Sequence, residues 1–237
     1  QAMNEIYSHN KVPIITGGTG FYIQALLYDI DFKENDEKNP VREELEQLAE
    51  KLGENAPQVL HQKLQEVDPE AAAQIHANNI KRVIRAIEYF KQTGEKISQH
   101  NEEMHQKDSP YNFLYYVLTR DRKVLYERID RRVDIMMENG LVDEVKKLKD
   151  MGCHRGQTSM QGLGYKEILD YLDGGCTLEE AVYILKRDTR HFAKRQITWF
   201  KREKDVTWMN YPDYNNSQAE MLDAMLKMIK ERGIIKR

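Results

Sequence analysis

The chain has 237 residues, enough for one large domain or two small ones. Hydrophobic residues make up 40% of it and charged residues 32%, a composition typical of a soluble globular protein. The net charge of −3 gives no global sign of nucleic-acid binding, so any basic surface must be local. Cys153 and Cys176 lack the spacing of a zinc site or a disulfide framework. No apolar run reaches membrane-spanning length and no targeting peptide is visible, so we expect a cytoplasmic protein.

The first residues predict a helix, a strand and a second helix joined by glycines. Residues 1–10 have the apolar spacing of a helix end, without a start signal. Residues 13–15 form a short apolar run that predicts a buried strand, and residues 21–27 resume with helical spacing. Because an interior strand of a parallel sheet needs neighbours, we expect an N-terminal portion before Gln1 to be missing from this sequence.

Between that strand and helix lie Gly17, Gly18, Thr19 and Gly20, which we call the glycine turn. A strand, a glycine turn and a helix start collect unpaired backbone N–H groups and the positive end of a helix dipole. This arrangement predicts an anion site, where the Thr19 hydroxyl could donate to a bound oxygen or cap the helix. The alternative is a turn that needs glycine only for its backbone geometry, and the motif GGTG alone leaves both interpretations open.

The next part of the chain predicts a compact helical insertion. Apolar residues recur at three- and four-residue steps in residues 41–52, 56–67, 69–75 and 80–94. Pro40, Pro57 and Pro69 fit helix starts, and Gly53 and Gly94 fit helix ends. Polar stretches without such a pattern, which we expect to be flexible, bound the insertion at residues 29–40 and 99–110.

The second half of the chain predicts a return to the sheet and then mostly helices. Residues 111–119 and 206–210 are rich in strand-forming residues. A long helix is expected over residues 122–151, with Gly140 interrupting its apolar stripe. Further helices are predicted at residues 165–172, 178–199 and 217–233.

Two helical segments carry cations at spacings that suit phosphate. Lys81, Arg82 and Arg85 lie on one of the predicted helices of the insertion, where a solvated basic face is the alternative. Arg128 and Arg132 are four residues apart, share one helix face and could bind a diphosphate through bidentate hydrogen bonds.

The nearby acids Glu127 and Asp130 could instead neutralise Arg128 and Arg132 in surface ion pairs, which is the commoner outcome.

Residues 186–202 show the strongest concentration of charge. They contain seven cations against a single acid, Asp188. The cations are Lys186, Arg187, Arg190, Lys194, Arg195, Lys201 and Arg202.

Aromatic residues (Phe192, Trp199 and Phe200) are interleaved with these cations. A basic, aromatic-laced helix in an acidic chain favours binding of phosphates or nucleic acid over a merely solvated face. Upstream, residues 160–167 (MQGLGYKE) form a glycine-rich loop that enters a helix. Its Gln161 and Lys166 side chains could approach a sugar-phosphate or a base edge, or its glycines could simply cap the helix.

These motifs occur together in one order: PIITGGTGFYIQALL, IKRVIRAIE, LYERIDRRV, QGLGYKE and TRHFAKRQITWFKR. In that combination the chain resembles the tRNA dimethylallyltransferase (tRNA isopentenyltransferase) family from Val12 to about Trp208, and AKRQITWF is the most specific motif. The resemblance implies transfer of a dimethylallyl group from dimethylallyl diphosphate to the N6 amine of an adenosine beside the tRNA anticodon, with Mg²⁺.

The resemblance also implies an α/β fold, a P-loop-kinase-like parallel sheet core with an all-helical insertion that grips the anticodon stem-loop. We expect the first part of the core at residues 1–35, the insertion at 36–108 and the second part of the core at 109–237, in a monomer. It implies that Thr19 lies at the reaction centre and that Gly17, Gly18, Gly20 and Arg132 bind the diphosphate. The implied tRNA-binding residues are Arg42, Lys81, Arg82, Arg85, Gln161, Gly162, Gly164, Tyr165, Lys166, Lys194, Arg195, Gln196, Thr198, Trp199 and Lys201.

The chain departs from the family pattern at its N-terminus. The family's phosphate loop GPTASGK(S/T) and its DS-x-x-x-Y motif, which contains the general base, do not occur in the sequence, and no metal ligand is identifiable. We therefore expect the full-length protein to be active and this chain alone to be inactive. The alternatives are a module that only binds RNA, and a nucleotide kinase that shares the core, against which the basic helix near the C-terminus argues.

Overall fold

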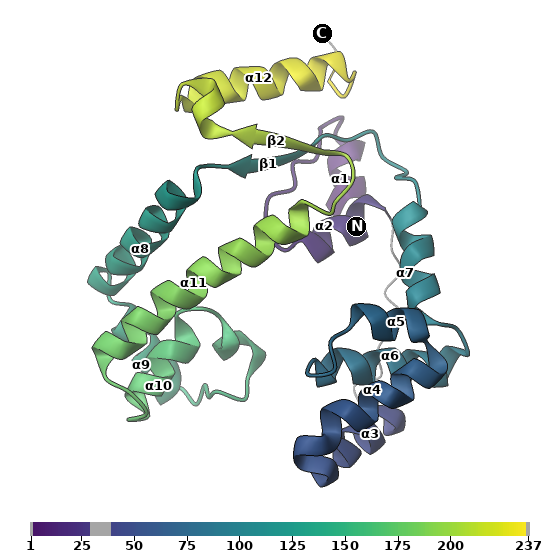
Figure 1. Ribbon diagram of the computed structural model, residues 1–237. Coiled ribbons are helices and arrows are strands. Elements are labelled where there is room, and N and C mark those ends of the chain that lie inside the picture. Colours follow the sequence, from purple (N-terminus) through teal and green to yellow (C-terminus); the bar gives the residue numbers. More distant parts are fainter. Residues whose placement is uncertain (1, 29–38, 236–237) are drawn as a thin grey trace. The chain divides into compact units, whose positions relative to one another are not determined.

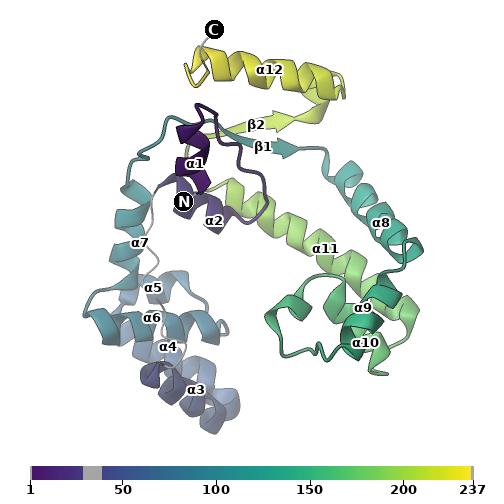
Figure 2. The ribbon, with the colours of Figure 1, turned by 180° about the vertical axis from the view of Figure 1, so that it is seen from behind.

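A computed structural model describes residues 2–28 and 39–235. The chain divides into two compact units. We call Gln1–Gly20 with Asn112–Arg237 the core unit, and Phe21–Tyr111 the helical unit. Each is described by itself below, and Figures 1 and 2 show their elements from two sides.

The helical unit contains helices joined by short turns. α2 (Gly20–Leu27) starts at the last residue of the core unit. The others are α3 (Pro40–Leu52), η1 (Gly53–Asn55), α4 (Ala56–Val67), α5 (Pro69–Gln74), α6 (Ile80–Thr93) and α7 (Ile97–Gln106). The helices predicted from apolar spacing are confirmed. The polar stretch at residues 29–40 lies largely outside the described residues.

The expectation of a flexible stretch at residues 99–110 is wrong over its first part, because α7 continues to Gln106. The helix is held at its start. Ile97 packs against the apolar cluster of the unit, and Ser98 hydrogen-bonds to Asp68. These tertiary contacts outweigh the weak helical pattern of the polar residues that follow.

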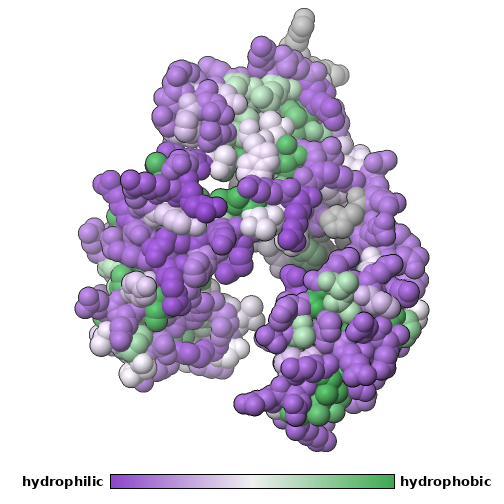
Figure 3. All heavy atoms as spheres, in the orientation of Figure 1, coloured by the Kyte–Doolittle hydropathy of each residue, from purple (hydrophilic) through white to green (hydrophobic). Residues whose placement is uncertain are grey.

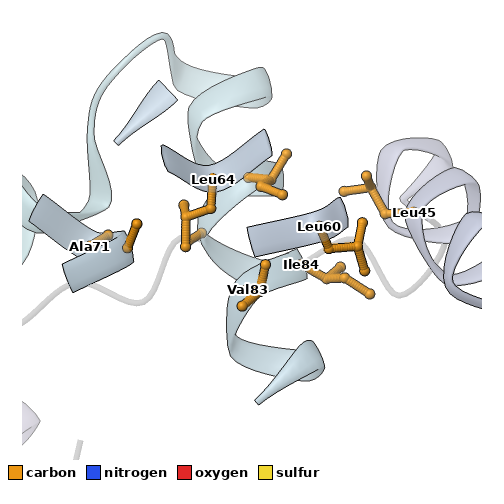
Figure 4. Packing of buried hydrophobic residues seen from close by; sticks show 9 residues of the cluster. Leu45, Leu60, Leu64, Ala71, Val83 and Ile84 are labelled. Atoms are coloured by element: carbon orange, nitrogen blue, oxygen red, sulfur yellow. The ribbon is translucent and has the colours of Figure 1, made fainter. Parts of the chain in front are cut away.

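A single apolar cluster joins the helices of this unit. Leu60 and Leu64 of α4 belong to one cluster with Leu45 of α3 and with Val83 and Ile84 of α6, and Figure 4 shows Leu60 on the side nearer Leu45. Leu60, Leu64 and Val83 are fully buried. Leu60 and Leu64, like Val83 and Ile87, are four residues apart and share one helix face, which explains why the sequence pattern identifies them.

Asp68 is a buried carboxylate at the start of α5. It accepts hydrogen bonds from the backbone N–H of Ala71 (3.0 Å) and from the N–H (2.9 Å) and hydroxyl (2.7 Å) of Ser98. Burial opposes its ionisation, but these hydrogen bonds and the charge of Lys96 together hold the pKa of the Asp68 carboxyl below its ordinary value. Asp68 therefore caps α5 and ties it to α7.

The core unit contains the sheet. Its elements are α1 (Ala2–Ser8), β1 (Tyr115–Thr119), α8 (Arg122–Glu138), α9 (Leu141–Asp150), η2 (Thr158–Gln161), α10 (Tyr165–Leu172), α11 (Leu178–Phe200), β2 (Val206–Asn210), η3 (Tyr211–Tyr214) and α12 (Gln218–Glu231). β1 and β2 pair in parallel, with Tyr115 opposite Val206. α12 lies along β1, whose Tyr116 hydroxyl donates to the carbonyl of Met225. The structure is thus mostly helical with a small parallel sheet (Figure 1).

The strand predicted at residues 13–15 is wrong. Residues 11–17 have no regular secondary structure, and Ile14 is 85% exposed. A strand exists only where a neighbour accepts and donates its backbone hydrogen bonds, and no described strand pairs with this segment. The strand predicted over residues 111–119 is also shorter than expected, because β1 begins at Tyr115.

The helices of the core unit enclose a second apolar cluster. Val133 of α8, Val145 of α9, Ile168 of α10 and Leu185 of α11 are buried in it. The predicted interruption of the long helix is confirmed at Gly140, whose φ of 89° lies in the left-handed region that favours glycine.

In Figure 3 polar residues cover most of the visible surface. Over residues 2–28 and 39–235, no helix combines the length and apolar character needed to cross a bilayer.

We predict that Asp68→Asn lowers the free energy of unfolding at pH 7 by about 1–3 kcal/mol, because it removes a charged acceptor from Ser98 and Ala71. The folded-state pKa is depressed, so the carboxylate stabilises fully above its ordinary value of 3.8 and loses this effect as the pH falls through the folded value. The difference from the wild type should therefore shrink below about pH 4. Urea denaturation over this pH range measures it.

Glu66→Gln is the matched control, since Glu66 is an exposed acid on the neighbouring α4. It should leave the free energy of unfolding nearly unchanged at every pH. An Asp68→Asn difference that stayed constant into the acid range would contradict the assignment of the charge.

Candidate functional site

The glycine turn is held against α11 by two side chains. The Gln196 side-chain amide donates to the carbonyl of Gly18 at 2.6 Å. A Cβ atom at Gly18 would overlap the Gln196 amide, and one at Gly20 would overlap the indole of Trp199. A side chain at position 20 would meet the rigid indole and one at position 18 would displace the Gln196 amide, whereas a Cβ at Gly17 would meet nothing within 4 Å.

Thr19 lies between these two contacts and is exposed, directly before α2. The family resemblance implies that Gln196 and Trp199 contact tRNA, and the sequence does not connect them to the glycine turn. The signal that could have found the connection is the glycines themselves, since glycine often marks a close approach of other groups. Beside Trp199, burial raises the pKa of the Glu203 carboxyl, and a hydrogen bond with Trp199 only partly offsets this.

An open pocket of about 730 Å³ lies along α8. Its lining combines Arg128, Arg131 and Arg132 with the apolar residues Ile129, Ile135 and Met136, and with Asn139. Guanidinium groups beside apolar side chains suit an anion that carries a hydrocarbon group. Neither Thr19 nor another residue of the glycine turn lines this pocket.

The acids near Arg128 and Arg132 do not neutralise them. Asp130 instead forms an ion pair with Arg190 of α11, and Asp134 pairs with Lys186 of α11 at 2.5 Å. Within residues 2–28 and 39–235, no carboxylate forms an ion pair with Arg128 or Arg132. Asp130 and Asp134 thus face α11, while Arg128, Arg131 and Arg132 line the pocket.

The basic face expected on α11 is divided into two parts. Lys186, Arg187 and Arg190 all pair with acids, Arg187 with its neighbour Asp188 at 2.8 Å. Closer to the glycine turn, Lys194, Arg195 and Lys201 are exposed, and no ion pair joins them to a carboxylate of the described segments. The guanidinium of Arg195 lies 5.9 Å from the centre of the Phe192 ring.

The glycine-rich loop ends in the N-cap of α10. Gly164 has a φ of 103° and its N–H donates to buried Glu167 at 2.8 Å, which closes the first turn of α10. Lys166 forms ion pairs with Glu167 (3.2 Å) and Asp188 (3.8 Å). The helix-capping alternative for the glycines therefore applies at Gly164, and Lys166 is less available to a phosphate than the sequence predicts.

Other side chains of this loop also have protein partners. The Tyr165 hydroxyl donates to Glu144, and this hydrogen bond, together with burial and the carboxylate charge, raises the pKa of Tyr165. The Gln161 side-chain amide donates to the carbonyl of Arg155. Gly162 of the loop is exposed, as is Thr198 of α11. These contacts leave the loop's surface accessible but fix its conformation.

In the helical unit, Arg42 of α3 pairs with buried Glu88 of α6 at 2.7 Å. Arg85 lies 3.9 Å from the same carboxylate oxygen. Lys81 and Arg82, one turn earlier on α6, are exposed. This unit therefore brings together the cations that the sequence places on two separate helices.

A metal site was not identifiable from the sequence. In the parts of the chain that the structure describes, no three His, Cys, Asp or Glu side chains are grouped so as to hold a metal ion. These residues alone do not fit an implied Mg²⁺, and no step below is assigned to it.

The glycine turn, the arginine-lined pocket along α8 and the cation-rich helix α11 have the chemistry that suits phosphate-containing ligands. The family model described as "IPP transferase" matches residues 1–203 and narrows this class to a transferase. A tRNA dimethylallyltransferase of Lachnoclostridium phytofermentans is 61% identical over 236 residues, 100% of this chain and 74% of the relative. One from Clostridioides difficile is 47% identical, over 97% of this chain and 72% of the relative. The chain therefore belongs to the tRNA dimethylallyltransferase family, whose members act in tRNA modification.

Solved structures agree. The tRNA isopentenylpyrophosphate transferase of Bacillus halodurans matches with 42% identity and a TM-score of 0.63, over 98% of this chain and 71% of that one. A eukaryotic dimethylallyltransferase described as acting on tRNA matches with 28% identity and a TM-score of 0.68, over 88% of this chain and 54% of that one.

We predict that Gly20→Ala lowers the free energy of unfolding by about 1–3 kcal/mol, because the new methyl group overlaps the Trp199 indole. It should also shift the fluorescence of Trp199, recorded with Trp208→Phe so that a single indole emits. Gly17→Ala is the control and should change neither quantity, since nothing lies within 4 Å of its Cβ. Equal effects at both glycines would refute the packing of Trp199 on the turn.

Proposed function

We propose that this chain binds dimethylallyl diphosphate and a tRNA anticodon stem-loop, for transfer of the dimethylallyl group to the N6 amine of the adenosine beside the anticodon. The observation that carries the proposal is the contact of α11 with the glycine turn through Gln196 and Trp199. The same helix is paired with α8, which bears the arginine pocket. Along α11, the six residue steps from Arg190 to Gln196 span only ~9 Å.

The chemistry needs an anion site next to a nucleophile. An adenine N6 amine is a poor nucleophile, so it must be held against the allylic carbon and lose a proton. Diphosphate leaves with developing negative charge, which Arg132 and the backbone N–H groups of Gly17, Gly18 and Gly20 would stabilise. Exposed Thr19 would orient the leaving group and the amine. The apolar residues Ile135 and Met136 would face the hydrocarbon group.

The RNA must present an unstacked base, which single-stranded loops do. Lys194, Arg195 and Lys201 would contact its backbone phosphates, because they are exposed and lie close in sequence to Gln196 and Trp199, which contact the glycine turn. The exposed parts of the glycine-rich loop would add contacts near the base, and Arg42, Lys81, Arg82 and Arg85 would contact the stem from the helical unit.

Some features stay predictions from the sequence. They are the P-loop-kinase-like core, the domain boundaries, the cytoplasmic monomer and Mg²⁺ as cofactor. Because neither GPTASGK(S/T) nor DS-x-x-x-Y occurs in the sequence, we expect the chain to bind its substrates without turnover. The exposed Lys194, Arg195 and Lys201 would equally suit the second candidate, a module that binds RNA only. The two differ in whether the chain binds dimethylallyl diphosphate.

We predict that Arg132→Ala weakens binding of dimethylallyl diphosphate about ten-fold or more, because it removes a charge-assisted hydrogen-bond donor from the pocket. Affinity for an anticodon stem-loop should change much less. Isothermal titration with each ligand measures both. Arg122→Ala removes the same charge from α8 outside the pocket and serves as the control.

Two results would count against the transferase assignment of the pocket. One is RNA binding with no detectable binding of dimethylallyl diphosphate, which is the result that the RNA-only module predicts. The other is equal loss from Arg132→Ala and Arg122→Ala, which would mean that only the net charge matters.

For Thr19→Ala we predict slower transfer, by about a hundred-fold, with nearly intact RNA affinity, since the hydroxyl acts on the reacting groups. The measurement is single-turnover transfer, with the family's phosphate loop and DS-x-x-x-Y segment supplied ahead of Gln1. Thr16→Ala, which changes an exposed threonine of the same loop, should react at the wild-type rate. Parallel loss of RNA binding and rate at Thr19 would argue for a binding role instead.

A further inference from the structure

Glu88 of α6 is a buried carboxylate whose side chain is only 3% exposed. Its Oε1 accepts a hydrogen bond from the Asn39 side-chain amide at 2.5 Å. Asn39 in turn caps α3, accepting from the backbone N–H of Val41 at 3.0 Å. Glu88 thus fixes the first turn of α3 from the neighbouring helix α6.

The other oxygen of Glu88 holds arginines. Oε2 accepts from Nη2 (2.7 Å) and Nε (3.3 Å) of Arg42, which lies in that first turn of α3. Nη1 of Arg85 lies 3.9 Å from the same oxygen. One buried carboxylate oxygen therefore faces two guanidinium groups that come from different helices.

This arrangement leaves a local excess of positive charge. A buried carboxylate is costly unless it is paired, and Glu88 is paired on both oxygens. Two guanidinium groups repel each other, and a carboxylate between them lowers that repulsion. The side chains of Arg42 and Arg85 remain 32% and 43% exposed. Both arginines therefore face Glu88 and still expose part of their side chains to solvent.

We propose that Glu88 is a positioning residue, which gathers Arg42 and Arg85 into a two-arginine site for one phosphate group of the RNA backbone. Guanidinium groups bind phosphate oxygens best when their planes are held in place, because less side-chain freedom is lost on binding. This inference rests on the proposed function, since it takes the phosphate to belong to the anticodon stem-loop. Neither the sequence pattern nor the resemblance gave Glu88 a role.

The competing account is that Glu88 only ties α3 to α6. A second ion pair between these helices provides the control. Lys91 of α6 pairs with Glu44 of α3 at 3.6 Å, and the Glu44 side chain is 69% exposed. Glu44→Gln therefore removes one negative charge and one interhelical ion pair, as Glu88→Gln does, without releasing Arg42.

The experiment measures affinity of the whole chain for an anticodon stem-loop with an adenosine 3′ to the anticodon. Glu88→Gln keeps the shape and an acceptor for Asn39 but removes the charge that holds the arginines. We expect Glu88→Gln to weaken binding of the stem-loop about five-fold, because the arginines are no longer held in place. The substitution also removes a negative charge, which by itself favours binding of RNA. Electrostatics alone would give tighter binding, and Glu44→Gln should bind as tightly as the wild type or slightly more so.

A double-mutant cycle identifies the arginine through which Glu88 acts. With both Arg42→Ala and Arg85→Ala present, Glu88→Gln should weaken binding no further, whereas either arginine substitution alone should leave part of its effect. Thermal unfolding of every variant shows whether the fold is intact. If Glu88→Gln lowers only the unfolding temperature while RNA affinity stays at the wild-type value, the inference is overturned. It is also overturned if Glu88→Gln has the same effect with and without the two arginines.

Failure of the proposed function looks different. A folded wild-type chain that shows no salt-sensitive binding to the stem-loop would overturn both the function and the inference. Loss of binding in Arg42→Ala, with wild-type binding in Glu88→Gln, would leave the function standing and overturn the role of Glu88 alone.

Discussion

The proposed site depends on the close packing of α11 against the glycine turn. Gln196 holds the carbonyl of Gly18, and the indole of Trp199 occupies the space that a side chain at position 20 would need. This contact joins residues that are far apart in the chain, and it fixes the backbone on either side of Thr19. Without it, the backbone N–H groups of the turn would have no defined direction, and an anion site there would not be preorganised.

Charge in the core unit is sorted by pairing between helices. Asp130 and Asp134 face α11 and neutralise Arg190 and Lys186, and Arg128, Arg131 and Arg132 of α8 line the pocket. The helical unit applies the same principle at Glu88, where buried acid and exposed arginine come from different helices. In both units acids are placed on faces between helices, and this leaves local positive surfaces on a chain with a net charge of −3.

Much of the fold could be predicted because helices carry their signal locally. The helices of the insertion, the break at Gly140 and strand β2 follow from apolar spacing, caps and glycine, and all are confirmed. Residues 13–15 failed because a strand depends on its neighbours. α7 was missed in part because Ser98 and Asp68 stabilise it from across the unit. In the candidate site, spacing alone could not tell which acids pair with which arginines. Asp130 is close in sequence to Arg132, yet it forms its ion pair with Arg190 of α11. Spacing could not show either that Gln196 faces Gly18.

The central claim is that the glycine turn and the α8 pocket bind one and the same prenyl diphosphate. Photolabelling with a diazirine analogue of dimethylallyl diphosphate, read by mass spectrometry of the labelled peptides, tests it most directly. The account predicts labels both in residues 17–20 and in residues 128–139, each reduced by excess unmodified ligand. Labelling confined to α8, with the glycine turn unmodified at saturating ligand, would contradict it.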